Sequence, residues 1–312
     1  MLLKYYFMIP ILIILAICII LYFYHHKGIP VFLFHHIQND FEDYLKIIEK
    51  SGFKTYTFSE VWSIISANNK IPLKTLLITI DDGYIDNYIV GFPLLKKYKL
   101  KATIFINTAY IGTDDRYMNW TQIDEMYKSK LIDFELHSHN HFAIFINNKS
   151  IRSASENDLL NPELQRLYKG NLNYGDPVFI TGSSYSNKGF IVTDNYIETR
   201  DPELLLCETE EQALERIRND ISENKKIIKE KLLKDTMFFA WPWGENSDFG
   251  KKAIRMAGVK GFVTSRKGTN SRRLNLDKIY RIEHRNLSQV KFKITLFVCQ
   301  NLILGKIYKL LS

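Results

Sequence analysis

The sequence predicts an α/β fold in which helices cover a parallel sheet, preceded by an apolar N-terminal segment. From Pro30 onward, short apolar runs alternate with amphipathic stretches, and this alternation favours parallel strands joined by helices. A hydrophobic content of 46% and a charged content of 24% are typical of a globular protein. A chain of 312 residues is long enough for one α/β barrel behind a membrane anchor.

The apolar runs are expected to form strands, and the stretches between them to form helices. The expected strands are Val31–His35, Leu76–Ile80, Ala102–Ile106, Ile132–Leu136, Met237–Trp241 and Gly261–Thr264. The expected helices are Phe41–Ser51, Ser59–Ala67, Pro93–Tyr98, Thr121–Lys128 and Glu210–Leu233. In folds of this kind the functional groups gather at the carboxyl ends of the strands.

The N-terminal segment Tyr5–Tyr24 is apolar and uncharged throughout. A helix of about 20 such residues spans the hydrocarbon core of a bilayer. No small-x-small cleavage site follows the run, which favours a retained anchor over a cleaved signal peptide. We therefore expect residues 1–27 to anchor the protein by a single membrane-spanning helix. Lys4 precedes the apolar run and Lys27 follows it, so these charges do not set the orientation of the helix in the membrane.

Charge and cysteine content narrow the possible partners. The net charge of +8 suits an anionic membrane surface or an acidic polymer. The basic residues are spread along the chain without a dense stripe or an RNA-binding motif, which argues against nucleic acid. The three cysteines (Cys18, Cys207 and Cys299) lie far apart and indicate neither a disulfide framework nor a thiolate metal site.

Two segments depart from the strand–helix rhythm. Residues Phe142–Arg200 form a long polar stretch, which we interpret as an insert at about 142–200 within a catalytic domain spanning 28–290. A connection of this length inside a domain is usually functional or mobile. Residues 291–312 are apolar with scattered lysines and predict a C-terminal helix that either packs on the domain or touches the membrane.

The first candidate site motif is Thr79–Tyr84, which reads Thr-Ile-Asp-Asp-Gly-Tyr and follows an apolar strand. Two carboxylates at the end of a buried strand are costly unless their charge is used. Adjacent residues point in different directions, so one of Asp81 and Asp82 can bind a metal while the other faces a reacting water. Alone, the Asp-Asp-Gly sequence is more often a surface turn.

The second motif follows another expected strand and holds three histidines, His137, His139 and His141. His137 and His141 stand four residues apart, a spacing that can bring two imidazoles to one ion. Neutral imidazole is a common ligand of zinc and related metals. The alternative is a solvated polar turn, and spacing alone would also allow His139 to replace His137.

The third motif is Trp241-Pro242-Trp243-Gly244, again after an apolar strand. Proline restricts the local backbone, and the flanking tryptophans can form the wall of a sugar-binding site. The same residues also occur in cores and at strand ends, so this motif by itself is a weak indication of substrate binding.

Taken in order, these motifs resemble those of the polysaccharide deacetylase family, also called the NodB-homology or carbohydrate esterase 4 group. The resemblance covers roughly Pro30 to Arg285 outside the insert, and no single motif would suffice for it. The opening strand, from Ile29 to His36, is similar to the start of a branch that acts on poly-N-acetylglucosamine. The family fold is an incomplete (β/α)7 barrel, which agrees with the alternation of strands and helices.

The resemblance also implies a role for each motif residue. Asp82, His137 and His141 would hold a divalent metal, with zinc as the expected ion. Asp81 would act as the general base, and the backbone N–H of Trp243 would stabilise the oxyanion. The family's early arginine is missing before Pro242, and Arg281 is its candidate replacement. The family's late histidine is expected at His284, which stands as the candidate acid, although an exposed histidine in a charged run is an equal alternative.

The implied function is the metal-dependent removal of N-acetyl groups from a carbohydrate polymer. Because such polymers lie outside the cytoplasm, we expect Lys4 on the inside and the catalytic domain on the outer side of the membrane. Two alternatives stay open on the sequence. The protein could be an O-acetyl esterase acting on an acetylated glycan, since the same metal, base and water would serve. It could also be a catalytically silent glycan-binding protein of the same fold.

Overall fold

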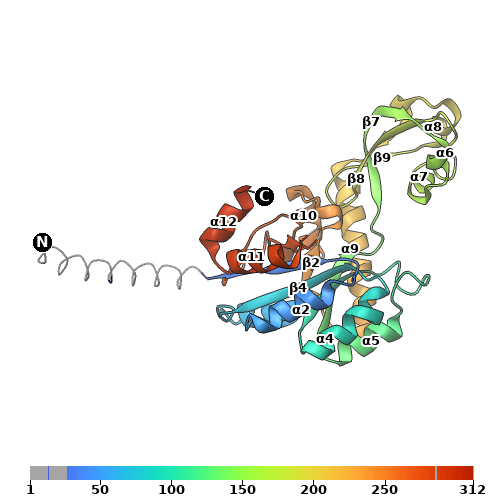
Figure 1. Ribbon diagram of the computed structural model, residues 1–312. Coiled ribbons are helices and arrows are strands. Elements are labelled where there is room, and N and C mark those ends of the chain that lie inside the picture. The colour runs from blue at the N-terminus through green and yellow to red at the C-terminus, as the bar shows by residue number, and fades with distance from the viewer. Residues whose placement is uncertain (1–12, 14–26, 285–286, 312) are drawn as a thin grey trace, which may run out of the picture.

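The computed structural model describes residue 13, residues 27–284 and residues 287–311, and its main element is a curled parallel sheet (Figure 1). Within these residues seven strands lie in the order β12-β11-β6-β5-β4-β2-β14, and the short β3 pairs with β4. All of these pairs are parallel. The strands are β2 (Val31–Phe34), β3 (Lys54–Thr55), β4 (Thr75–Asp82), β5 (Ala102–Asn107), β6 (Ile132–Ser138), β11 (Phe238–Ala240), β12 (Gly261–Val263) and β14 (Ile282–Glu283). The predicted α/β fold with a parallel sheet is confirmed.

Helices cover the outer face of this sheet. They are α2 (Phe41–Lys50), α4 (Phe92–Tyr98), α5 (Trp120–Lys128), α9 (Glu210–Leu232), α10 (Asp248–Met256), α11 (Gln289–Cys299) and α12 (Leu302–Leu311), with the short turns η1 (Asn87–Gly91) and η3 (Pro242–Gly244). Helix α3 (Phe58–Ser66) instead packs on the interior side through Phe58 and Val61. The largest core cluster joins outward strand residues to α2, α4, α5, α9, α10 and α11. Burial of this apolar surface is the main force holding the helices on the sheet.

The inner face of the sheet is more polar than the outer face. In β6, Phe134 and Leu136 belong to the outer core, whereas Asp133, Glu135 and His137 alternate with them and face inward. The same period of two applies in the neighbouring strands. The buried polar residues of this face are Thr79, Asp81, Thr103, Asp133, Glu135 and His137. A smaller apolar cluster, including Val31 and Phe105, fills the rest of the interior.

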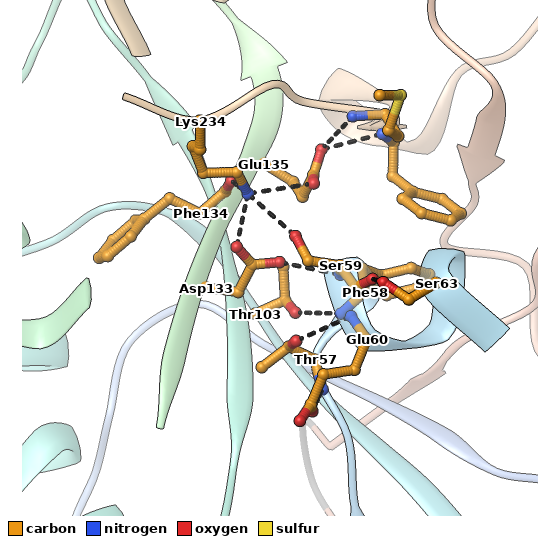
Figure 2. A network of polar contacts seen from close by, with 12 residues as sticks. Thr57, Phe58, Ser59, Glu60, Ser63, Thr103, Asp133, Phe134, Glu135 and Lys234 are labelled. Carbon is orange, nitrogen blue, oxygen red and sulfur yellow. Dashed lines mark hydrogen bonds and ion pairs between the residues drawn. The ribbon is translucent and has the colours of Figure 1, made fainter. Parts of the chain in front are cut away.

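A buried ion network occupies the amino-terminal end of β6 (Figure 2). Lys234 donates to Asp133 Oδ1 and to Glu135 Oε1, and both carboxylates are buried with it. The other oxygen of Asp133 accepts the backbone N–H of Ser59, at the start of α3. The other oxygen of Glu135 accepts two backbone N–H groups at the start of β11, at 2.8 and 2.9 Å. The network therefore ties α3 and β11 to β6.

Residues 143–207 form a separate antiparallel sheet that projects from the barrel (Figure 1). Its strands, in the order β10-β9-β7-β8, are β7 (Ala143–Ser153), β8 (Pro177–Ser183), β9 (Phe190–Ile191) and β10 (Leu206–Cys207). Short helices α6 (Glu156–Leu159), α7 (Pro162–Leu167), α8 (Asp194–Thr199) and η2 (Pro202–Leu204) pack on it. An aromatic core that includes Phe145, Tyr168 and Tyr196 holds this part together. The polar stretch read from the sequence thus contains a folded unit.

The C-terminal stretch forms two helices, α11 and α12, where the sequence predicts one. Asn301 separates them because its side-chain oxygen accepts the N–H groups of Ile303 and Leu304, which begins a new helix. The short strands β1 (Gly28–Ile29) and β13 (Asn270–Ser271) pair beside this turn. The predicted membrane helix at residues 5–24 lies outside the described residues, apart from residue 13. Among the described residues, no helix has the length and apolar character needed to span a bilayer.

Candidate active site

The two central strands of the sheet end in the first two motifs. β4 ends at Asp82, and β6 ends at Ser138, directly after His137. Asp82 has a φ of 76° and Gly83 has a φ of 83°, so the chain turns sharply as it leaves β4. Glycine adopts this left-handed conformation at little cost. Asp82 is still paired with Ile106 at the end of β4, and it lines the same cavity as Asp81. The carboxyl ends of the strands therefore bring both motifs to one place, as the sequence predicts.

Asp82, His137 and His141 come together at this end of the sheet. Asp82 Oδ1 lies 3.2 Å from His137 Nε2 and 3.8 Å from His141 Nε2. In a four-coordinate zinc site with nitrogen and oxygen ligands, two ligand atoms lie about 3.4 Å apart. His137 Nδ1 lies 2.9 Å from the Ala240 carbonyl oxygen, which leaves Nε2 aimed at Asp82. Among the described residues this trio is a group that can hold a metal ion, and its geometry fits one.

The charges of Asp82 and His141 suit a cation. Burial lowers the pKa of His141 to about 4, with help from the neighbouring His137, so this imidazole is neutral near pH 7. Burial alone would raise the pKa of Asp82, but the hydrogen bond and charge of His137 outweigh it and hold the pKa below its ordinary value. An ionised carboxylate beside a neutral imidazole is the protonation state that metal ligands need.

His139, the alternative ligand left open by the sequence, points elsewhere. Its Nδ1 lies 2.9 Å from Thr108 Oγ1. Its backbone N–H donates to Asp220, whose carboxylate also accepts the backbone N–H of Asn140 and the hydroxyl of Tyr185. The structure therefore groups His137, and not His139, with Asp82, while α9 holds the motif loop through Asp220.

Asp81 forms a buried ion pair with Arg281. The guanidinium donates to both carboxylate oxygens, at 2.7 and 2.8 Å, and each side chain is about 1% exposed. Burial would raise the pKa of Asp81, yet the charge of Arg281 helps to keep it lowered, so the carboxylate is ionised. Arg281 Nε also donates to the Thr264 carbonyl oxygen, which fixes its plane. Arg281 thus stands where the missing early arginine is expected to act.

His35 is a site residue that the sequence analysis missed. It directly follows β2, lines the same cavity as Asp81, and its buried Nδ1 has no hydrogen-bond partner among the described residues. Burial lowers its pKa. The sequence feature that could have indicated His35 is its position at the carboxyl end of a predicted strand, as for the Asp81–Asp82 and His137–His141 motifs.

His284, the sequence candidate for the acid, is placed differently. Its ring stacks on Phe34 at 4.5 Å, and its Nδ1 lies 3.2 Å from the Leu33 carbonyl oxygen. It is buried and is not among the residues that line the cavity. This placement does not support the expected role, because an acid must reach the leaving group.

The cavity beside the trio has a volume of about 410 Å³ and opens at the carboxyl ends of the strands. Trp241 and Trp243 line it, whereas Pro242 is buried and is not part of the lining. Trp243 is 50% exposed and packs 4.4 Å from the His141 ring. Its φ of 53° turns the chain at this point. Of the predicted substrate contacts, Trp243 is the one that offers an exposed aromatic face.

The comparison with known families matches residues 68–171 to the polysaccharide deacetylase model, a range that includes Asp82, His137 and His141. Residues 68–171, about a third of the chain, are thus similar to the polysaccharide deacetylase family. The chain is 33% identical over 125 residues to a putative polysaccharide deacetylase, YxkH, of Bacillus subtilis. This match covers 37% of the chain described here and 44% of YxkH. The chain is also 33% identical over 124 residues to a poly-β-1,6-N-acetyl-D-glucosamine N-deacetylase of Staphylococcus aureus, a match that covers 38% of this chain and 42% of the relative. The matches thus span less than half the length of these curated relatives.

Solved structures share the fold of this chain. The deacetylase domain of BpsB from Bordetella bronchiseptica superposes with a TM-score of 0.64 at 18% identity, covering 83% of this chain and 96% of that one. A de-N-acetylase from Aggregatibacter actinomycetemcomitans gives a TM-score of 0.65 at 16% identity, covering 86% and 100%. At these identities the likeness concerns the fold, and the family's curled parallel sheet is the one described above.

Proposed function

We propose that this protein is a metal-dependent hydrolase that removes N-acetyl groups from an N-acetylglucosamine-type polysaccharide. The observation that carries the proposal is the trio of Asp82, His137 and His141 beside the Asp81–Arg281 pair in one open cavity. The curated relatives named as poly-β-1,6-N-acetyl-D-glucosamine N-deacetylases support this substrate class.

In this proposal the trio binds one divalent metal, with zinc as the expected ion. Such an ion polarises the acyl carbonyl and lowers the pKa of the attacking water. Asp81 accepts the proton from that water, and Arg281 keeps Asp81 ionised and oriented for this step. The water oxygen bonds to the acetyl carbon, the carbon–nitrogen bond breaks, and acetate and a free sugar amine result.

The leaving amine needs a proton, and we assign its delivery to His35. The residue lines the cavity with Asp81, and its buried Nδ1 has no hydrogen-bond partner among the described residues. The backbone N–H of Trp243 is our candidate for stabilising the oxyanion, and the exposed indole face would pack against a sugar ring.

Acetate release from a defined N-acetylglucosamine oligomer tests this function. The purified full chain is stripped with a chelator and assayed with and without added zinc, with His141→Ala as the matched inactive variant. Zinc-dependent acetate release by the native chain alone is the expected result. Release from O-acetylated xylan but not from the oligomer would make the protein an esterase. Oligomer binding with no release from either substrate would make it a silent binding protein.

We also propose that residues 5–24 anchor the protein by one membrane-spanning helix, with the catalytic domain outside the cytoplasm. The uncharged run of the sequence and the class of substrate support this location. Protease added to intact spheroplasts is expected to digest the domain. Protection until the cells are lysed would place the domain inside and would contradict the assignment of an extracellular polymer.

A further inference from the structure

Helix α11 is apolar on two opposite sides. Phe292 and Leu296 are buried against the domain. On the other side Val290, Ile294 and Phe297 are 66%, 58% and 64% exposed. Their spacing of four and three residues places them on one face of the helix. A helix with apolar residues all round is usually buried on both sides, so this face lacks a partner among the described residues.

The adjacent helix α12 extends this surface and adds charge. Ile307 and Leu310 are 48% and 85% exposed. Residues 288–312 contain no aspartate or glutamate, and their four lysines are Lys291, Lys293, Lys306 and Lys309. Exposed apolar side chains next to lysines, without acidic residues, are typical of helices that lie in the interface of an anionic membrane.

The two helices lie where the N-terminal segment joins the fold (Figure 1). Lys27 forms an antiparallel bridge with Asn301, in the turn between α11 and α12, and Gly28 N donates to the Gln300 carbonyl oxygen at 2.7 Å. Lys27 follows the uncharged run Tyr5–Tyr24 by three residues. A bilayer holding that run would therefore lie beside these helices.

A second basic feature lies at the same end of the molecule. A cavity of about 560 Å³ is lined by Lys27, Gly28, Gly52, Phe53, Lys54, Leu73, Lys74 and Gln300. Its three lysines stand at the amino-terminal ends of β1, β3 and β4, and no carboxylate lines it. Positive charge thus extends from the helices onto the neighbouring strand starts.

We propose that α11 and α12 form a second membrane-contacting surface that holds the amino-terminal end of the barrel against an anionic bilayer. Val290, Ile294 and Phe297 would enter the headgroup–acyl boundary, and the lysines would lie among the lipid phosphates. Each lysine near an anionic surface strengthens the attraction about fivefold. The catalytic cavity lies at the opposite, carboxyl ends of the strands and so faces away from the bilayer, towards the polymer.

Site-specific photocrosslinking in the full chain tests this surface. The benzophenone amino acid p-benzoylphenylalanine replaces Phe297 in one variant and Leu160 in the matched control, where Leu160 is 81% exposed directly after α6 in the projecting part of the chain. Both are reconstituted into phosphatidylcholine vesicles containing phosphatidylglycerol and irradiated. A lipid adduct at position 297 and none at 160 is expected. Equal adducts at both positions, or a protein–protein crosslink without lipid at 297, would overturn the proposal, the latter in favour of a second copy.

The charge contribution is tested separately. In the Phe297-labelled chain, the double change Lys291→Glu and Lys293→Glu is expected to lower the lipid adduct at least about fivefold in anionic vesicles. The control pair is Lys149→Glu, exposed on β7, and Lys188→Glu, exposed in the connection between β8 and β9, and this pair should leave the adduct unchanged. Equal adduct yields from both pairs would contradict the proposal. None of these lysines lies in the active site, so acetate release separates this result from the proposed function.

Discussion

The two ends of β6 each carry a buried charged cluster, and the clusters differ in how their charges are balanced. At the amino-terminal end, Lys234 lies between Asp133 and Glu135. Every remaining carboxylate oxygen there accepts a backbone N–H group. Burial raises the pKa of Glu135 to about 7, while the two carboxylates raise the pKa of Lys234 despite its own burial. This cluster is complete within the protein.

At the carboxyl-terminal end the balance is only partial. Asp81 has Arg281 as its cation, but the partners of Asp82 are the imidazoles of His137 and His141 and the amide of Asn107. The described residues give Asp82 no lysine or arginine partner. Burial of charge alone therefore does not identify a site. A carboxylate at an open cavity whose described partners are imidazoles and an amide does identify one, because its charge is available to a cation.

The largest expected effect comes from truncating a candidate metal ligand in the cluster at the carboxyl-terminal end of β6, which we call the open cluster. His141→Ala is expected to abolish metal retention and to lower acetate release more than ~1000-fold, because the proposed ion would contribute several kcal/mol to the reaction. Elemental analysis and the oligomer assay measure both. Stoichiometric metal and normal turnover in His137→Ala would instead return His139 to the ligand set.

Breaking the cluster of Lys234, Asp133 and Glu135 at the amino-terminal end of β6 should lower the stability of the fold. Lys234→Met leaves two buried carboxylates without their cation and is expected to lower the free energy of unfolding by about 3–5 kcal/mol. Urea denaturation measures this loss, with Lys231→Met on the exposed face of α9 as the control. Adding Glu135→Gln to Lys234→Met should recover part of the stability. A Lys234→Met protein as stable as the native chain would show that the Lys234 cluster does not hold β11 and α3.

The next effect separates catalysis from metal binding within the open cluster. Asp81→Asn is expected to keep metal affinity near normal and to lower the rate by ~100-fold or more, since the amide cannot accept the proton. Metal titration and kinetics together test this. If Asp81→Asn lost the metal while Asp82→Asn retained it, the two roles would be reversed.

The smallest effect distinguishes two buried histidines. His35→Ala is expected to lower the rate by about 100-fold with metal retained, as for a positioned acid. His284→Phe, which preserves ring packing against Phe34, should leave the rate within a few-fold. Kinetics on the oligomer measure both variants. The opposite pattern would restore His284 as the acid.

Much of the site could be predicted because strand ends in a parallel sheet converge. The motifs at Asp81–Asp82 and His137–His141 each follow an apolar run, so both were expected at one edge, and the structure brings them together there. The partner of Asp81 was harder to predict. Arg281 is 200 residues away, and only the pairing of β14 with β2 carries it next to the site.

His35 shows the limit of motif reasoning. It lies at a strand end like the other site residues, but the resemblance to the family predicted the acid at a late histidine, His284. His284 is also next to a strand, β14, yet its ring turns into the core against Phe34. Which face a side chain takes depends on strand register and neighbouring packing, and neither can be read from the order of the residues.

The sequence by itself determined the parallel α/β fold and the three motifs, because periodicity and residue type act locally along the chain. Only the tertiary structure decided which histidine joins Asp82, which arginine balances Asp81 and which buried charges balance one another. Those outcomes depend on distances of 3 to 4 Å or less between residues far apart in the chain. The energy of buried charges is set by such distances and by the surrounding protein, and it exists only once the sheet has closed around them.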